Sequence, residues 1–485
     1  MPRLLPAPAG LLAAALGCGL VAVLVLGTLS GGADAARYLL LGVVALLALV
    51  GCLAVPVEHL PTVALVLLVL VPDRIADYSS SPVLTPATAV LAVWTVRRLL
   101  TRSTTDAEQP VGGEHRLRHV LTGSAVLLLV GMVPLVLVSP SKRFSIGWVA
   151  TFALAVVVPL LVGDLEREGR RLRQALPWVG SVVAGYAIVE YLLEQNLVYG
   201  PLYDALGLDE LQHWSVYRSD ATLGHPLVAG LFFATVLGFC TGRWLESHRS
   251  RFAAAAVLNG LGIVTTVSRG SYIAAAAAVS VVLLTALCVE RQHRARRLLV
   301  LAVFAVGGVL AANSDAFVER GLSAEGLSSL NSRSSLPQIA VDTARAYHWL
   351  GGGPASSLPL AEPYNFQHLP IENSYLQLLI GIGLWGLALF VLVLVLAAVR
   401  AVRGRSFSGL GALVGYATAA GGFAALDSRR DLVVLLGLLV VIALRRPDER
   451  PAPGADEELP RPAGRPQPVR RPAAVPVGAG RGGAR

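Results

Sequence analysis

Residues 374–399 read SYLQLLIGIGLWGLALFVLVLVLAAV, an apolar run without a single charged side chain. A transmembrane helix needs about 20 predominantly apolar residues, so this run is long enough to cross a bilayer. It lacks the alternation of apolar and polar residues that is typical of a barrel strand. Only helices and closed barrels satisfy their own backbone in hydrocarbon. The run therefore predicts a membrane-spanning helix.

Similar apolar runs recur along the whole chain. Of its 485 residues, 54% are hydrophobic and only 15% are charged, whereas an average soluble domain carries about a quarter of charged residues. The sequence predicts an all-α polytopic transmembrane bundle of about 12–14 spans, because two of the runs are short for a full crossing. The apolar segments are Leu11–Leu29, Tyr38–Val55, Leu60–Val71, Val83–Leu100, Val120–Val138, Trp148–Val162, Trp178–Leu193, Leu223–Phe239, Phe252–Val267, Ser271–Val289, Leu298–Ala312, Ser374–Val399, Leu410–Ala425 and Leu432–Leu444.

Arginine is distributed unevenly between the loops that join these segments. Five loops on one side hold nineteen arginines, whereas the short loops opposite hold seven basic residues. Loops rich in Arg and Lys are retained in the cytoplasm. The asymmetry predicts a multi-pass protein of the cell (plasma or inner) membrane with both termini in the cytoplasm. It also explains the net charge of +9 without a nucleic-acid partner.

The chain is predicted to form one transmembrane domain, residues 1–445, followed by a tail, residues 446–485. The tail is dense in Pro, Arg, Ala and Gly, a composition that predicts a disordered cytoplasmic segment. A second soluble domain and internal repeats are not expected.

Two long loops are predicted to face outward, residues 194–222 and residues 313–373. Loops of this length are usually functional or disordered. In the second loop, serines and an early proline at Ser334–Pro337 predict the start of a short external helix that continues to Trp349.

The chain lacks the usual signatures of soluble enzymes, among them the P-loop, HExxH and paired CxxC motifs, so we expect neither a metal nor another cofactor. Ionisable residues at the outer membrane boundary are costly and become the functional candidates. Arg218 directly precedes a span, and Arg269 lies in a tight turn where positive-inside statistics disfavour arginine. A guanidinium is suited to bidentate phosphate binding. The alternative is a snorkelling or helix-capping arginine.

Three further candidates come from the second outward loop. Arg333 precedes the predicted external helix and could be a solvated surface charge. Glu372 and His368 precede the span at Ser374, and either could act as a general base. Alternatively, Glu372 caps the following helix, because acids favour helix N-termini.

In this order, these elements resemble the O-antigen ligase and O-antigen polymerase (Wzy-type) superfamily of integral-membrane glycosyltransferases. The family's ligase motif is a His followed by Asn, Ser or Gln, nine residues, Gly, two residues, and Gly, Thr or Tyr. Here Asn373, Gly383 and Gly386 fill the motif, with Glu372 in the histidine's position, and Tyr375 belongs to a segment that is typical of the family. The resemblance extends over residues 186–398. It includes the element Ser268-Arg269-Gly270, Arg218 with Gly224-His225-Pro226, and the glycine-rich segment Leu350–Pro354.

The resemblance implies transfer of a glycan from a polyprenyl-diphosphate carrier to an acceptor hydroxyl on the outer face, without a metal. The diphosphate would be bound by Arg218 and Arg269, with Arg333 as the third arginine. Glu372 would be the first choice for the base and His368 the second. The partners would be the lipid-linked glycan donor, a glycan or another envelope acceptor, and membrane lipids. The enzyme would polymerise a surface polysaccharide or act like an O-antigen ligase.

A transporter or lipid-linked glycan flippase is the alternative from another class. Transporters usually place their polar residues near the bilayer midplane on broken helices. The predicted spans are nearly free of charge at that depth, and Glu190, near the outer end of its span, comes closest to an exception. The sequence therefore favours the glycosyltransferase.

Overall fold

The computed structural model describes residues 50–72, 85–101, 113–205, 216–289, 298, 324–427 and 429–445, and within these ranges it contains no β-strand. All of them lie in one compact unit, which ends at Pro447. The predicted span Leu11–Leu29, most of Tyr38–Val55 and of Leu298–Ala312, and the predicted tail lie outside the described residues.

The described apolar helices overlap the predicted runs, but some begin earlier, most of all α9, which begins at Leu165 where the run begins at Trp178. The elements are η1 (Val57–His59), α3 (Leu60–Leu70), α5 (Pro86–Thr101), α6 (Gly113–Val138), α7 (Lys142–Phe152), the π-helical turn η2 (Ala153–Val157), α8 (Val158–Val162), α9 (Leu165–Leu193), α10 (Gly200–Ala205), α11 (Pro226–Ser247), α12 (Ser250–Thr265), α13 (Arg269–Val289), α16 (Ala324–Ala346), α17 (Ser357–Ala361), η3 (Glu362–Tyr364), α18 (Ser374–Arg403), α19 (Phe407–Ala420) and α20 (Arg430–Leu444).

Six of these helical stretches are long and apolar enough to cross a membrane, which confirms the all-α transmembrane class. They are Arg116–Val138, Lys142–Val162, Leu165–Leu193, Pro226–Ser247, Arg269–Val289 and Ser374–Arg403. Three shorter apolar helices, Val57–Leu70, Ser250–Thr265 and Phe407–Ala420, lie among them.

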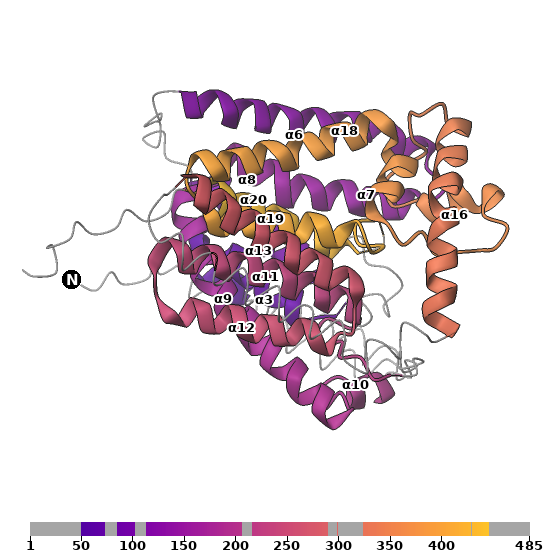
Figure 1. Ribbon diagram of the computed structural model, residues 1–485. Helices are drawn as coiled ribbons and strands as arrows, with labels where there is room; N and C mark the ends of the chain where they lie inside the picture. The colour runs from indigo at the N-terminus through magenta and orange to yellow at the C-terminus, as the bar shows by residue number, and fades with distance from the viewer. Residues whose placement is uncertain are drawn as a thin grey trace, which may run out of the picture. The chain divides into compact units, whose positions relative to one another are not determined.

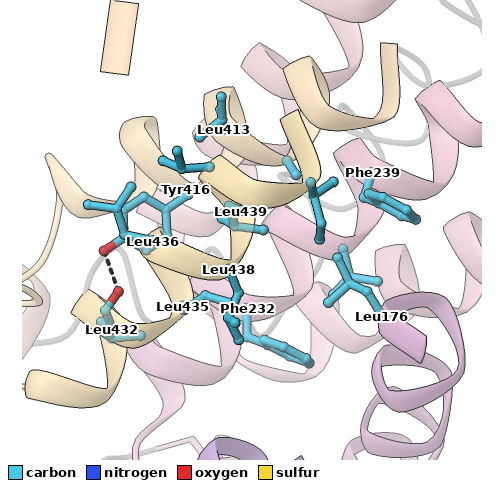
Figure 2. Close-up of a cluster of buried hydrophobic side chains, with 14 of the residues drawn as sticks. Leu176, Phe232, Phe239, Leu413, Tyr416, Leu432, Leu435, Leu436, Leu438 and Leu439 are labelled. Carbon is cyan, nitrogen blue, oxygen red and sulfur yellow. Dashed lines mark hydrogen bonds between the residues drawn. The ribbon is translucent and has the colours of Figure 1, made fainter. Parts of the chain in front are cut away.

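The core is built around α11, which is buried along almost its whole length and packs against α12, α13 and α19. Close approach of α11 to α19 depends on Gly238, because a Cβ there would lie 2.3 Å from the carbonyl oxygen of Gly411. Small residues at a helix crossing allow such contact in a membrane protein. Figure 2 shows Phe232 of α11, Tyr416 of α19 and leucines of α20 in one cluster. The Tyr416 hydroxyl donates to the carbonyl oxygen of Leu432 over 2.7 Å.

Contacts between helix termini define two ends of the bundle. The basic end contains the N-terminal ends of α6, α9 and α19 and the C-terminal ends of α5, α11, α18 and α20. The opposite end, which we term the loop end, contains residues 190–205, 216–226, 265–271, 347–375, 421–427 and 429–431. At the loop end, α16 lies across the ends of the other helices, packed against α18 (Figure 1).

Buried ion pairs join helices at the basic end. Arg173 of α9 pairs with Glu246 of α11, and the side chains are 0% and 4% exposed. Glu246 also accepts from the backbone N–H of Ser408 at 2.8 Å. Arg445, after α20, pairs with Glu166 of α9 at 3.1 Å. Opposite charges thus join α9 to α11 and to the residue after α20, and Glu246 adds α19 through a backbone hydrogen bond.

The external helix is present but longer than predicted. We expected it to begin near Ser334, whereas α16 begins at Ala324 and contains Pro337 in its interior. The serines and the proline resemble an N-terminus, but the good helix formers upstream, such as Ala324 and Glu325, extend the helix. A small apolar cluster attaches α16 to α17 and α18; its members are Ala340, Leu360, Ala361, Ile371 and Ile380.

Two of the predicted spans are interrupted. Within α18, Gly383 has φ 74° and ψ 178°, so the helix breaks there. The predicted segment Leu410–Ala425 ends as a helix at Ala420, because Gly421 and Gly422 begin a non-helical loop. This loop, residues 421–427, is named the hub loop below because it contacts four other segments.

Candidate functional site

Arg218 is buried at the loop end, with 2% of its surface exposed. Its Nε donates to the carbonyl oxygen of Thr266 over 3.0 Å, and the backbone N–H of Ser219 donates to that of Thr265 over 3.0 Å. Both acceptors belong to the turn between α12 and α13. Half-buried Arg269, which begins α13, follows three residues later. The structure thus places the two predicted diphosphate-binding arginines on segments that pack against each other.

The buried carboxyl group of Glu190 holds residues on both sides of Arg218. Oε1 of Glu190, in α9, accepts from the Tyr217 hydroxyl at 3.2 Å and from the backbone N–H of Asp220 at 3.1 Å. Asn196 in turn donates to Oδ1 of Asp220 over 2.9 Å. Burial raises the pKa of Tyr217, so its hydroxyl remains a donor at physiological pH. The sequence marked Glu190 only as an exception, although a buried acid in an apolar helix is itself a functional signal.

Asn373, and not Glu372, caps α18. The Asn373 side-chain oxygen accepts from the backbone N–H groups of Tyr375 at 2.9 Å and Leu376 at 3.2 Å. The proposed capping role of Glu372 is therefore wrong, because the residue after it already provides the oxygen. Glu372 is half-buried immediately before the cap. Exposed His368 lies four residues upstream in a loop, with φ 50°.

The hub loop connects the start of α18 to the arginine element. The hydroxyl of Ser374 donates to the carbonyl oxygen of Phe423 at 2.8 Å and accepts from the N–H of Ala425 at 2.9 Å. The ring of Phe423 stacks on that of His225, with centroids 5.4 Å apart. His225 caps α11 and follows Arg218 in the same element. The predicted base region and the predicted diphosphate region therefore share one neighbour.

The hub loop also reaches α13 and the start of α17, which follows the glycine-rich segment. A Cβ on Gly422 would lie 3.7 Å from the Cα of Gly270, next to Arg269. Asp427 Oδ2 accepts from the Ser357 backbone N–H at 2.9 Å and from its hydroxyl at 2.5 Å. Burial raises the pKa of Asp427 to about 6, against the lowering effect of these hydrogen bonds. The sequence gave no sign of these contacts, because residues 421–425 belong to the predicted span Leu410–Ala425 and only residues 426 and 427 fall in the loop predicted after it.

The glycine-rich segment fills the break in α18. The N–H groups of Gly352 and Gly353 donate to the carbonyl oxygens of Ile380 and Gly381 at 3.2 and 2.8 Å. In return, the carbonyl oxygen of Trp349 accepts from the N–H of Leu384 at 2.9 Å. Backbone groups freed within a membrane helix must find such partners.

Glycine is required on both sides of this contact. A Cβ on Gly351 would lie 2.6 Å from the carbonyl oxygen of Gly381, and one on Gly383 would lie 2.4 Å from that of Trp349. Gly386 has a milder constraint, since its Cβ would meet the Ile382 side chain at 2.8 Å. The two glycines of the ligase-like motif thus occupy the break and the next helical turn.

Arg333 lies within α16, and its side chain is outside what the structure describes. Its predicted role therefore stays a prediction. The other site predictions, Arg218, Arg269, Glu372, His368, Asn373, Tyr375, Gly383 and Gly386, all fall in or directly beside the loop end.

Residues 254–391 match the family described as O-antigen ligase. This match supports membership of the O-antigen ligase and polymerase family. The region that matches the O-antigen ligase family contains Arg269, His368, Glu372 and the break in α18, whereas Arg218 and the hub loop lie outside it. Curated proteins yield no match to the chain. Membership of the O-antigen ligase family suggests a glycosyltransferase-like enzyme, and together with the six candidate spans it points to a multi-pass membrane protein.

Proposed function

We propose that the chain transfers a glycan from a polyprenyl-diphosphate carrier to an acceptor hydroxyl at the loop end. The observation that supports this most is the packing of Arg218 against the turn that leads to Arg269, beside the entry of α18. Ionisable residues at a membrane boundary mark candidate substrate sites, and a guanidinium suits the geometry of a diphosphate.

The chemistry requires a group that stabilises a leaving diphosphate. As the glycosidic C–O bond breaks, negative charge grows on the diphosphate oxygens, and preorganised donors lower the barrier by acting on that charge. Thr266 and Glu190 together fix the Arg218 segment, one through Nε and the other through the flanking backbone. Arg269 would contribute a second guanidinium, and Arg333 a third.

The acceptor must lose its hydroxyl proton as the new bond forms. Glu372 is our first choice for the base because it is half-buried beside the start of α18. His368 is the second choice, since imidazole has the better-matched intrinsic pKa. The acceptor would be a growing surface polysaccharide or another envelope molecule.

The proposal includes the orientation of the protein in the membrane. The basic end and both termini would face the cytoplasm of the cell membrane, and the loop end would face outward. An impermeant thiol reagent should label Gln338→Cys on α16 in intact cells. Labelling only after lysis would invert the topology and remove the outer-face mechanism.

Purified protein in nanodiscs, supplied with a synthetic polyprenyl-diphosphate glycan and an acceptor glycan, tests the reaction directly. We expect a transferred product by mass spectrometry, and none from the matched monophosphate donor. Glu372→Gln should abolish transfer, His368→Ala should retain it, and Glu372→His should keep part of it. Retained transfer in Glu372→Gln with loss in His368→Ala would move the base to His368. Normal transfer in both would remove the base assignment.

The family match does not favour a transporter or flippase. A transporter would move the intact lipid-linked glycan across the bilayer without forming a new glycosidic bond. The appearance of product in the nanodisc assay, where no second compartment exists, distinguishes the two.

A further inference from the structure

The turn after α16 presents large apolar side chains on its surface. Tyr347 and Trp349 are each 37% exposed, and Leu350 is 60% exposed. Single exposed apolar residues are ordinary, but contiguous ones mark an interaction surface. The turn, residues 347–350, therefore needs a partner.

This turn is fixed to α18 at the break. Trp349 accepts from the N–H of Leu384, and the indole N–H of Trp385 donates to the carbonyl oxygen of Leu350 at 3.0 Å. The position of the turn along α18 is thus determined by hydrogen bonds. Its depth in the membrane follows from the depth of Gly383.

The length of α18 gives that depth. Arg400 and Arg403 lie in the last turns of the helix, at the basic end. Gly383 lies 17 residues before Arg400, or about 25 Å at a rise of about 1.5 Å per residue. The hydrocarbon core is about 30 Å thick. With the arginines at one boundary, the break and the attached turn lie close to the other.

An apolar surface leads along α18 to the turn. Leu384 is 53% exposed, and Val391, Leu392 and Val395 are 39%, 38% and 50% exposed. In a membrane-spanning helix these side chains face lipid. Leu384 is hydrogen-bonded through its backbone to Trp349, so the lipid-facing surface continues into the turn. Trp and Tyr are also the residues enriched where hydrocarbon meets headgroups.

We propose that the 347–350 turn inserts into the interfacial layer of the membrane at the loop end, where Trp349 and Leu350 contact phospholipid. The partner is the boundary between headgroups and acyl chains, where an indole has its ring in apolar surroundings and its edge near polar groups. Lipid contact would set the height of α16 and of the glycine-rich segment above the membrane. The inference is independent of the glycan-transfer reaction.

Site-specific fluorescence in nanodiscs tests this proposal on the full-length chain. In a variant without the native cysteines, Leu350→Cys carries a bimane label, and Gln338→Cys on the exposed surface of α16 is the matched control. We expect phospholipids brominated near the headgroup to quench the label at position 350 and aqueous iodide to leave it nearly unchanged. The control should show the reverse, with a red-shifted emission relative to position 350.

Iodide quenching at position 350 equal to that of the control would overturn the proposal. Quenching by neither reagent would also overturn it, because the turn would then be covered by protein. If Leu350→Cys fails to assemble, Tyr347→Cys provides the same comparison. Neither result depends on whether the protein transfers glycans, so a failure here leaves the proposed function standing.

Discussion

Both ends of the bundle bury charged side chains, but these side chains have different partners. At the basic end, Arg173 pairs with Glu246 of another helix. At the loop end, Glu190 and Asp427 accept from backbone N–H and hydroxyl groups of loop segments, and Arg218 donates to a turn carbonyl. Charges at the basic end therefore hold helices to one another, whereas those at the loop end hold loops in place.

This difference indicates where chemistry is possible. An ion pair between helices neutralises its own charge and serves the fold. A carboxyl group that accepts hydrogen bonds from a loop fixes the conformation of that loop. The segments held in this way contain Arg218 in one case and directly follow the glycine-rich segment in the other. We therefore expect substitutions at the basic end to affect stability and those at the loop end to affect transfer.

The largest stability effect should come from Arg173→Met. Glu246 would lose its fully buried partner and keep Arg243 at 3.2 Å, so the loss should be smaller than the roughly 3–5 kcal/mol for a buried charge left without any partner. Unfolding titrations in mixed detergent should show this loss, and Arg173→Met combined with Glu246→Gln should recover part of it. A change below about 1 kcal/mol, the range of exposed pairs, would mean that the basic end is not held by these charges.

Gly383→Ala should cause the next largest loss of stability. Its φ of 74° disfavours a side chain, and the new Cβ would meet the Trp349 carbonyl at 2.4 Å. With ψ at 178° the conformation is essentially restricted to glycine and costs another residue on the order of 1–3 kcal/mol, and the contact adds to it. Gly123→Ala in α6 is the control, because nothing lies within 4 Å of its Cβ. Equal thermal stability of the two variants would contradict the claim that α18 breaks at Gly383 in a conformation that requires glycine.

Asp427 should make stability depend on pH. Its folded-state pKa of about 6 lies above the ordinary value of 3.8. Between these two pH values the folded state therefore binds more protons than the unfolded state. Stability should therefore fall by roughly 1–3 kcal/mol as pH rises from about 4 to 6 and then level off. Asp427→Asn should flatten this part of the profile. An unchanged slope in the variant would show that another group causes it.

Exposed ion pairs should contribute almost nothing to stability at either end of the bundle. Arg170–Glu166 at the basic end and Arg345–Asp342 in α16 have their arginine side chains 52% and 67% exposed. Such pairs contribute about 0–1 kcal/mol. Thermal melts of Arg170→Ala and Arg345→Ala should match the wild type. A marked loss in either would show that exposure is a poor guide to which charges matter.

The sequence predicted the helices well, because hydrophobic runs of this length have few other solutions. It also singled out Arg218 and Arg269, which the structure places on adjacent segments, while their role stays a prediction. It could not predict the break at Gly383, since a glycine within a membrane helix is often tolerated without one. The contact of Asp427 with Ser357 joins residues 70 positions apart, and local patterns carry no information about such a pairing. The sequence pointed to Glu372 as a possible cap, whereas the geometry gives that role to the next residue, Asn373.

The most direct test of the account is the rate of glycan transfer by Arg218→Lys and Arg269→Lys beside Arg170→Lys, all at normal expression. Lysine keeps the charge but lacks the bidentate fork. Loss of a donor to the leaving diphosphate should raise the barrier by about 2–4 kcal/mol. We predict strongly reduced transfer in the two loop-end variants and a wild-type rate in the basic-end control. Wild-type rates in both loop-end variants would contradict the assignment of the loop end as the site of transfer.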